Sequence, residues 1–219
     1  MRAKTGRFGW MTLKIDLAKA YDRIQWIFVR DTLVAAKVPQ EFIELTMSCI
    51  TTASMQIQWN GGLTEEFRPS RGLRQGCPLS PYIFKLCMER IGKLVEATVA
   101  REDWKPILLS QRGPLLSHLF FADDLIFFGV SSMELVQVIS QCLREFGAAS
   151  GQQVSRPKSR VFFSQNVIAA DVARLSATLD IPETKNFGRY LGVPVIHDPV
   201  TKDTYTELID RIDARLASN

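Results

Sequence analysis

Two adjacent aspartates, Asp123 and Asp124, interrupt the most apolar stretch of the sequence and constrain how that stretch can fold. Residues 119–121 before them and 125–128 after them consist of leucine, isoleucine and phenylalanine, which predicts two strands with the aspartates at the hairpin tip. Adjacent carboxylates there repel each other and resist desolvation. One interpretation is a solvated turn, because aspartate is a common turn residue. The other is a Mg²⁺ site, which needs carboxylates and substrate phosphates but no histidine or cysteine.

A third carboxylate, Asp16, lies at the end of another predicted strand. Met11, Leu13 and Ile15 alternate there with polar residues, as in a half-buried strand. A strand-end aspartate is commonplace by itself. Together with the aspartate pair, however, it gives three carboxylates that one sheet could bring together, which is the ligand set for two-metal phosphoryl transfer. We expect Asp22, in contrast, to cap the following helix.

The remaining pattern predicts a mixed α+β fold with helices packed on one face of an antiparallel sheet. Apolar residues at helical spacing predict helices over residues 26–38, 40–51, 84–95, 135–146, 166–179 and 205–216. Alternating or continuous apolar runs predict strands over residues 11–17, 115–121, 125–128 and 161–164. Asn60-Gly61-Gly62 between two further apolar segments predicts a hairpin.

Composition excludes several classes of protein. In 219 residues, 46% are hydrophobic and 23% charged, which is ordinary globular composition and excludes a disordered chain. We expect no membrane span, because charged residues interrupt the longest apolar run, and no secretory signal. Four cysteines without CxxC spacing and only two histidines argue against a structural zinc site and fit an intracellular, reducing compartment. The net charge of +4 is weak evidence for a polyanionic partner.

Five separated motifs then occur in the order and spacing typical of a reverse transcriptase. The chain most closely resembles the polymerases of non-LTR (LINE-type) retrotransposons, of the kind abundant in plant genomes. The combination is specific, since the HLFFADD segment follows an RQGCPLSP segment and the motifs extend over nearly the whole chain. The motifs are KIDLAKAYD (14–22), RGLRQGCPLSPYIF (71–84), HLFFADD (118–124), SGQQVSRPKS (150–159) and YLGVP (190–194).

The resemblance implies a palm fold and a role for each carboxylate. Asp16 and Asp123 would be the principal ligands of two Mg²⁺ ions, which Mn²⁺ could replace, and Asp124 would complete the acidic cluster. Lys158 matches the lysine of the family's fourth palm motif. It is a candidate proton donor to the pyrophosphate leaving group, or simply a charge near it. A surface lysine is the alternative interpretation.

The resemblance also implies substrate contacts. Tyr21 occupies the position that stacks beneath the incoming sugar and excludes a 2′-hydroxyl, although a core aromatic residue would also fit. Gln75 and Gly76 match the loop that packs on the templating base and the nucleotide. Arg71 and Arg74 are candidates for phosphate contacts, with solvated loop arginines as the alternative.

The primer end would be gripped by the turn of the last motif, which comprises Tyr190, Leu191 and Gly192. We expect residues 1–195 to form a partial reverse transcriptase palm and residues 196–219 a C-terminal helix leading toward a missing thumb. Most of the fingers, which hold template and nucleotide in such enzymes, are expected to be missing as well. A partner chain could supply fingers or thumb.

Three functions remain open on the sequence alone. The first is an RNA-directed DNA polymerase fragment that transfers nucleotides from a dNTP to a DNA primer on an RNA template, with no membrane involved. The second is a catalytically silent remnant of a retroelement. The third is a non-catalytic nucleic-acid-binding module that uses its loop arginines and lysines. The intact carboxylates favour past or present catalysis over binding alone.

Overall fold

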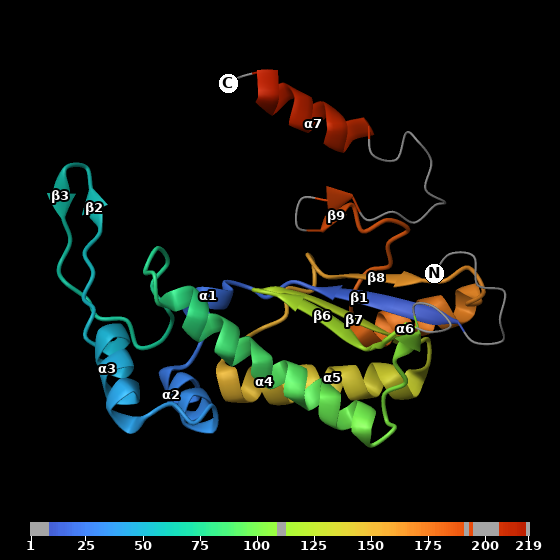
Figure 1. Ribbon diagram of the computed structural model, residues 1–219, viewed down its shortest axis with the longest axis horizontal. Coiled ribbons are helices and arrows are strands. Elements are labelled where there is room, and N and C mark those ends of the chain that lie inside the picture. Colours follow the sequence, from blue (N-terminus) through green and yellow to red (C-terminus); the bar gives the residue numbers. More distant parts are fainter. Residues whose placement is uncertain (1–8, 109–112, 191–192, 195–205, 218–219) are drawn as a thin grey trace.

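The computed structural model describes residues 9–108, 113–190, 193–194 and 206–217. Its centre is a four-stranded antiparallel sheet in the order β6-β7-β1-β8, so the first strand of the chain lies between strands from its second half (Figure 1). These strands are β1 (Trp10–Ile15), β6 (His118–Phe121), β7 (Asp124–Val130) and β8 (Arg160–Phe163). The expected α+β class with an antiparallel sheet is confirmed.

Helices cover one face of the sheet. Figure 1 shows α4 and α5 side by side beneath the strands, and they also make the most extensive helix–helix contact. Both helices follow the apolar spacing in the sequence, and their apolar faces are buried. The helices are α1 (Ala20–Arg23), α2 (Trp26–Ala35), α3 (Gln40–Thr51), α4 (Ser80–Ala100), α5 (Met133–Ser150), α6 (Ala169–Leu179) and α7 (Thr206–Ala217). No helix in the described residues is long and apolar enough to cross a membrane.

The hydrophobic core lies between β1 and the helices. Leu13 lies opposite Phe127 of β7 and Val161 of β8, and this row of three side chains is at most 1% exposed. Trp104, next to this core, is also buried, and its indole N–H donates a hydrogen bond of 2.8 Å to the Phe128 carbonyl. The polar atom of a buried tryptophan is thereby satisfied.

One helix start differs from the one that the sequence predicts. Asp22 does not cap a helix: it lies inside the one-turn helix α1, and α2 begins at Trp26 after an extended Gln25. At α5 the capping residue is Ser132, whose hydroxyl accepts a hydrogen bond from the Leu135 N–H. A chain of short turns around residues 16–25 is set by tertiary hydrogen bonds, which local capping patterns do not reveal.

In the described residues, six short strands form three two-stranded antiparallel pairs outside the central sheet. In the predicted hairpin at residues 58–63, Asn60 and Gly61 both adopt positive φ (47° and 81°), as a two-residue hairpin turn requires. This hairpin projects beyond α3 in Figure 1, and Trp59 on it is 74% exposed. The remaining strands are β2 (Gln58–Trp59), β3 (Gly62–Leu63), β4 (Ile107–Leu108), β5 (Leu115–Leu116), β9 (Arg189–Tyr190) and β10 (Val193–Pro194).

Candidate active site

The antiparallel register of β1 and β7 brings two of the predicted carboxylates together. Ile15 pairs with Leu125 at the end of this ladder. One position further along, Asp16 follows Ile15 and Asp124 precedes Leu125, so the two aspartates occupy facing positions although they are far apart in the sequence. Both side chains are half-buried. The sheet edge at this end therefore carries the acidic residues.

Asp123 lies in the turn between β6 and β7. Phe121 pairs with Asp124, which leaves Ala122 and Asp123 as the two turn residues. Ala122 adopts a φ of 51°, a conformation that costs an alanine free energy and that the surrounding strands impose. Asp123 is exposed at the tip, as a carboxylate that meets a ligand from solvent must be.

Burial and the charges of the neighbouring aspartates and lysines act on the pKa of Asp16. Burial raises the pKa of the Asp16 carboxyl, and the negative charges of Asp123 and Asp124 raise it further. The positive charges of Lys158 and Lys14 act in the opposite direction on the same pKa. Lys14 also forms an ion pair with Asp124, with 3.7 Å between its Nζ and Oδ1. The site thus combines mutual repulsion of carboxylates with flanking cations.

The carboxylates at this sheet edge are donors of the kind that Mg²⁺ binds together with substrate phosphates. In the part of the chain that the structure describes, no group of three or more His, Cys, Asp or Glu side chains is gathered closely enough to hold a metal ion alone. Mg²⁺ usually takes only one or two protein carboxylates and completes its shell with water and substrate phosphates. Half-exposed carboxylates that repel one another at a sheet edge meet that requirement.

The loop that carries Lys158 is fastened to the main-chain atoms of Asp16. The Asp16 N–H donates to the Ser159 hydroxyl at 3.1 Å, and the Ser155 N–H donates to the Asp16 carbonyl at 2.8 Å. Ser159 in turn donates to the Ser155 carbonyl. Lys158 itself is exposed, yet its charge reaches Asp16. Asp16 and Lys158, two predicted site residues from distant segments of the chain, are thereby brought close together.

The 70–79 loop, which contains the predicted substrate residues, is anchored on α1. The Leu73 N–H donates to the Tyr21 carbonyl and the Gly72 N–H to the Ile24 carbonyl, both at 2.8 Å. The Trp26 indole N–H donates to the Gly72 carbonyl at 2.7 Å. Because α1 follows directly after Asp16, these bonds fix the loop relative to the carboxylates.

Replacement of Gly72 by alanine tests this anchoring. At Gly72 φ is +93° and an added Cβ would lie 2.9 Å from the Asp22 carbonyl oxygen, a backbone atom that cannot easily move. We expect Gly72→Ala to lower the free energy of unfolding by about 2 kcal/mol, from an unfavourable φ and overpacking together. Gly76→Ala is the matched control, because φ there is +83° but nothing lies within 4 Å. We expect Gly76→Ala to lower the free energy of unfolding, measured by urea denaturation, by about 1 kcal/mol. Equal losses in the two variants would contradict the anchoring.

The aromatic ring predicted beneath the sugar is stacked on a phenylalanine of α4. Tyr21 lies on Phe84 of α4, with ring centroids 4.4 Å apart and an interplanar angle of 14°. The negative charge of Asp123 contributes to raising the pKa of the Tyr21 phenol, after burial as the main cause. Tyr21 thus packs against the core, as one of its two interpretations requires, whereas its role toward the sugar stays a prediction.

The exposed part of the 70–79 loop borders a cavity of about 690 Å³. Its lining includes Arg71, Arg74 and Gln75 from the loop and Asp22 from α1. The Gln75 side-chain amide donates to an Asp22 carboxylate oxygen at 3.3 Å. Asp22 was the residue whose role the sequence misassigned; its contact across the chain could be found only in three dimensions.

Two further residues at the site were missed. Lys14 pairs with Asp124, and Ser159 holds the backbone of Asp16. The sequence signal for Lys14 was its position on a strand two residues before Asp16, which puts both side chains on the same face.

The predicted primer-end turn is described only in part. Tyr190 pairs with Val193 in the β9–β10 hairpin, whereas Leu191 and Gly192 lie outside the described residues.

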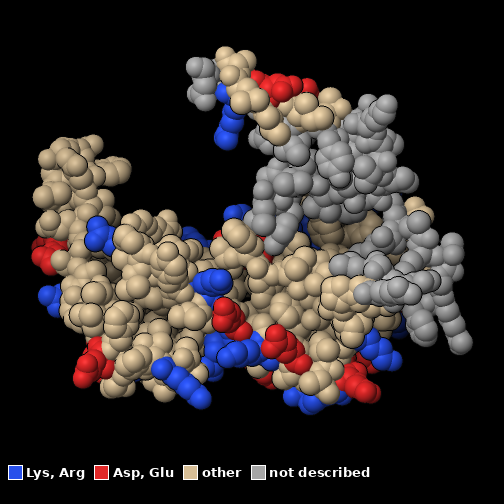
Figure 2. Space-filling model, in the orientation of Figure 1, with Lys and Arg blue, Asp and Glu red and all other residues tan. Residues whose placement is uncertain are grey.

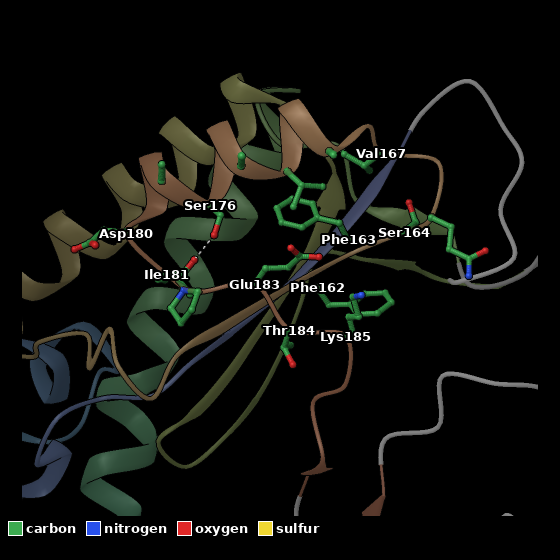
Figure 3. A pocket seen from close by; sticks show the side chains of 16 residues that line it. Phe162, Phe163, Ser164, Val167, Ser176, Asp180, Ile181, Glu183, Thr184 and Lys185 are labelled. Carbon is green, nitrogen blue, oxygen red and sulfur yellow. Dashed lines mark hydrogen bonds between the residues drawn. The ribbon is translucent and has the colours of Figure 1, made fainter.

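A larger cavity elsewhere does not belong to this site. About 830 Å³ in volume, it lies between α6 and the segment at residues 181–185 (Figure 3). Phe163, Val172 and Ile181 contribute apolar side chains to it, and the Ser176 hydroxyl donates to the Ile181 carbonyl. None of the predicted site residues lines it. The candidate active site is therefore the carboxylate edge with its neighbouring loop.

Comparison with known sequences identifies relatives over most of the chain. The profile of the family described as "Reverse transcriptase (RNA-dependent DNA polymerase)" matches residues 2–195. The Pol polyprotein of the Drosophila melanogaster retrotransposable element R2DM is 29% identical over 129 residues, or 59% of this chain and 11% of that protein. An uncharacterized mitochondrial protein of Arabidopsis thaliana is 35% identical over 108 residues, or 48% of this chain and 84% of that protein. A Xenopus laevis TX1 transposon protein is 27% identical over 151 residues, or 67% of this chain and 11% of that protein.

Solved structures show the same fold at low sequence identity. Telomerase from Candida tropicalis, in complex with a telomeric RNA fragment, superimposes with a TM-score of 0.57 at 15% identity. The match covers 75% of this chain and 27% of the telomerase chain. A truncated apo form of that telomerase gives a TM-score of 0.56 at 18% identity, over 74% and 32% of the two chains. The present chain thus spans about a tenth of the R2DM and TX1 proteins and under a third of the telomerase chain.

Proposed function

The chain belongs to the reverse transcriptase family, and from this premise we propose that it is the palm of an RNA-directed DNA polymerase of the non-LTR retrotransposon type. The reaction is nucleotidyl transfer from a dNTP to the 3′-hydroxyl of a DNA primer on an RNA template. One observation carries the proposal most directly. Asp16 faces Asp124 across the β1–β7 register, and the charges of Asp123 and Asp124 both raise its pKa.

In this proposal Asp16, Asp123 and Asp124 hold two Mg²⁺ ions. When bound, such ions activate the primer hydroxyl and neutralise the departing pyrophosphate. The protein positions the reactants and supplies charge, which accounts for most of the catalysis of phosphoryl transfer. Lys158, whose charge already reaches Asp16, places a cation or a proton donor beside the leaving group.

The 70–79 loop and α1 bind the nucleotide in this proposal. Tyr21, fixed on Phe84, forms a rigid wall under the sugar and leaves no room for a 2′-hydroxyl. Gln75 and Gly76 approach the base pair, and Arg71 and Arg74, both exposed at the same cavity, contact phosphates. In this proposal the last motif, which contains Tyr190, Leu191 and Gly192, holds the primer end.

The domain limits follow from the same proposal. Residues 1–195 form the palm in this proposal, and residues 196–219 form a C-terminal helix that leads toward a thumb. Exposed apolar side chains on α2, α3 and the β2–β3 hairpin give fingers a surface on which to pack, and the hairpin tip shows no charge in Figure 2. Those side chains include Ile27, Val34, Phe42, Leu45, Trp59 and Leu63.

Primer extension on an RNA template, with Mg²⁺ or Mn²⁺ added, tests the proposal. We expect dNTP-dependent lengthening of a DNA primer that stops when EDTA removes the metal. The absence of extension by a cooperatively folded sample would overturn polymerase activity in favour of a catalytically silent remnant. Salt-sensitive RNA binding that ignores both metal and dNTP would instead identify a binding module.

A further inference from the structure

Two of the four cysteines line one cavity beside the nucleotide loop, and we propose that Cys49 and Cys77 form a dithiol site that a peroxide oxidises to a disulfide. The cavity measures about 540 Å³. Cys49 lies near the end of α3, and Cys77 lies in the 70–79 loop immediately before α4. The lining runs from residues 49–50 directly to residues 74–80, so the thiols stand on the two chain segments that form its walls.

Accessibility divides the four thiols into two pairs. Cys49 is exposed and Cys77 half-buried, whereas Cys87 and Cys142 are buried in the helices. Burial raises the pKa of the Cys87 thiol to about 12 and also raises that of Cys142. An oxidant in solution therefore reaches Cys49 and Cys77 more readily than the two buried thiols.

Cys77 is the nucleophile of the pair. Its pKa lies below the usual cysteine value because the Leu79 N–H, the Ser80 hydroxyl and the Ser80 N–H donate hydrogen bonds to its sulfur. These donors stand at the first turn of the 21-residue helix α4, where the helix dipole favours negative charge. Low pKa and partial exposure together are the conditions for thiolate oxidation.

The reaction balances with hydrogen peroxide as the oxidant. The Cys77 thiolate attacks one peroxide oxygen, the O–O bond breaks, hydroxide leaves and a sulfenic acid forms. The Cys49 thiolate then attacks the Cys77 sulfur, forming the S–S bond and displacing a second hydroxide. Together with the two thiol protons, this yields one disulfide and two molecules of water. Two electrons pass from the dithiol to the peroxide.

The bond would act on the proposed nucleotide site, and this consequence rests on the proposed function. Cys77 is next to Gly76 and two residues from Gln75, and Arg74 also lines the cavity. A disulfide holds the α-carbons of its two cysteines about 4.4–6.8 Å apart, so a bond to Cys49 ties this loop to α3. The loop that the proposed function assigns to the nucleotide then loses freedom to adjust to its ligand.

Peptide mapping after peroxide treatment tests the site without any activity assay. The folded protein is treated with hydrogen peroxide, remaining thiols are alkylated, and non-reduced peptides are analysed by mass spectrometry. We expect a 49–77 disulfide that dithiothreitol reverses, with Cys87 and Cys142 recovered as thiols. Cys49→Ser should leave Cys77 as a sulfenic or more oxidised acid, and Cys77→Ser should leave Cys49 mostly unmodified. Intermolecular dimers through Cys49, or no 49–77 peptide, would overturn the proposal.

The functional arm compares oxidised and reduced protein in primer extension. We expect oxidation to lower primer extension by the parent at least about 10-fold, which corresponds to about 1.4 kcal/mol. Oxidised Cys49→Ser should extend primers within about 2-fold of the reduced variant. Equal loss in both would show that the bridge does not control the loop. If the parent shows no extension even when reduced, the polymerase proposal fails, and peptide mapping still decides the dithiol site.

Discussion

Replacing Asp123 with asparagine will reduce Mg²⁺-dependent primer extension by at least about 100-fold, a loss comparable to removal of one group that stabilises transition-state charge. The substitution keeps the size of the side chain and removes its charge. Asp123 is exposed at the turn tip, so the loss cannot be assigned to the core. Without that carboxylate, the proposed two-metal site would lack a ligand while Asp16 and Asp124 remain.

Asp31→Asn is the matched control for this experiment. Asp31 is an exposed residue of α2, away from the carboxylate edge, and the chemical change is the same. We expect this variant to extend primers within about 2-fold of the parent. Urea denaturation of both variants should give midpoints close to that of the parent. Retention of full extension by Asp123→Asn would refute the assignment of this carboxylate as a metal ligand.

Truncating Leu13 to alanine will lower the free energy of unfolding by about 2–5 kcal/mol, the range for fully buried leucines. Leu13 is 0% exposed and sits at the middle of β1, between Phe127 and Val161 on the neighbouring strands. The helices beneath the sheet close the cavity that the truncation would leave. A small domain has only about 5–15 kcal/mol of total stability, so this loss is a substantial fraction of it.

Leu115→Ala provides the comparison for that measurement. Leu115 is also in a strand, but it is 66% exposed, so its truncation removes little buried surface. Its effect should stay within about 0.5 kcal/mol. Chemical denaturation followed by circular dichroism measures both variants, and a loss at Leu13 no larger than at Leu115 would mean that β1 is not the centre of the core.

Much of the local structure could be predicted because local physics decides it. The apolar spacing of α4 and α5, the alternation of β1 and the Asn60–Gly61 turn are each consequences of neighbouring residues. Strand order could not be predicted in this way. That β1 lies between β7 and β8 depends on pairings between segments more than a hundred residues apart, which no local pattern encodes.

The residues of the candidate site likewise fall into those that the sequence predicts and those that only the structure reveals. The sequence singled out Asp16 and the Asp123–Asp124 pair, because carboxylates at apolar strand ends are costly without a ligand. It assigned Asp22 to a helix cap, whereas the structure places it in contact with Gln75. It also overlooked Lys14, whose pairing with Asp124 exists only because β1 and β7 are adjacent.

The family, the element types and the candidate carboxylates could be predicted from the chain alone, since motif spacing and hydrophobic period are properties of the chain. The tertiary structure decided what those residues meet. It set Asp16 opposite Asp124 through the β1–β7 register, fixed the 70–79 loop on α1 through main-chain hydrogen bonds, and placed Cys49 and Cys77 on one cavity. Such long-range pairings arise from burial and hydrogen bonding summed over the whole core, so they appear only when the chain is folded.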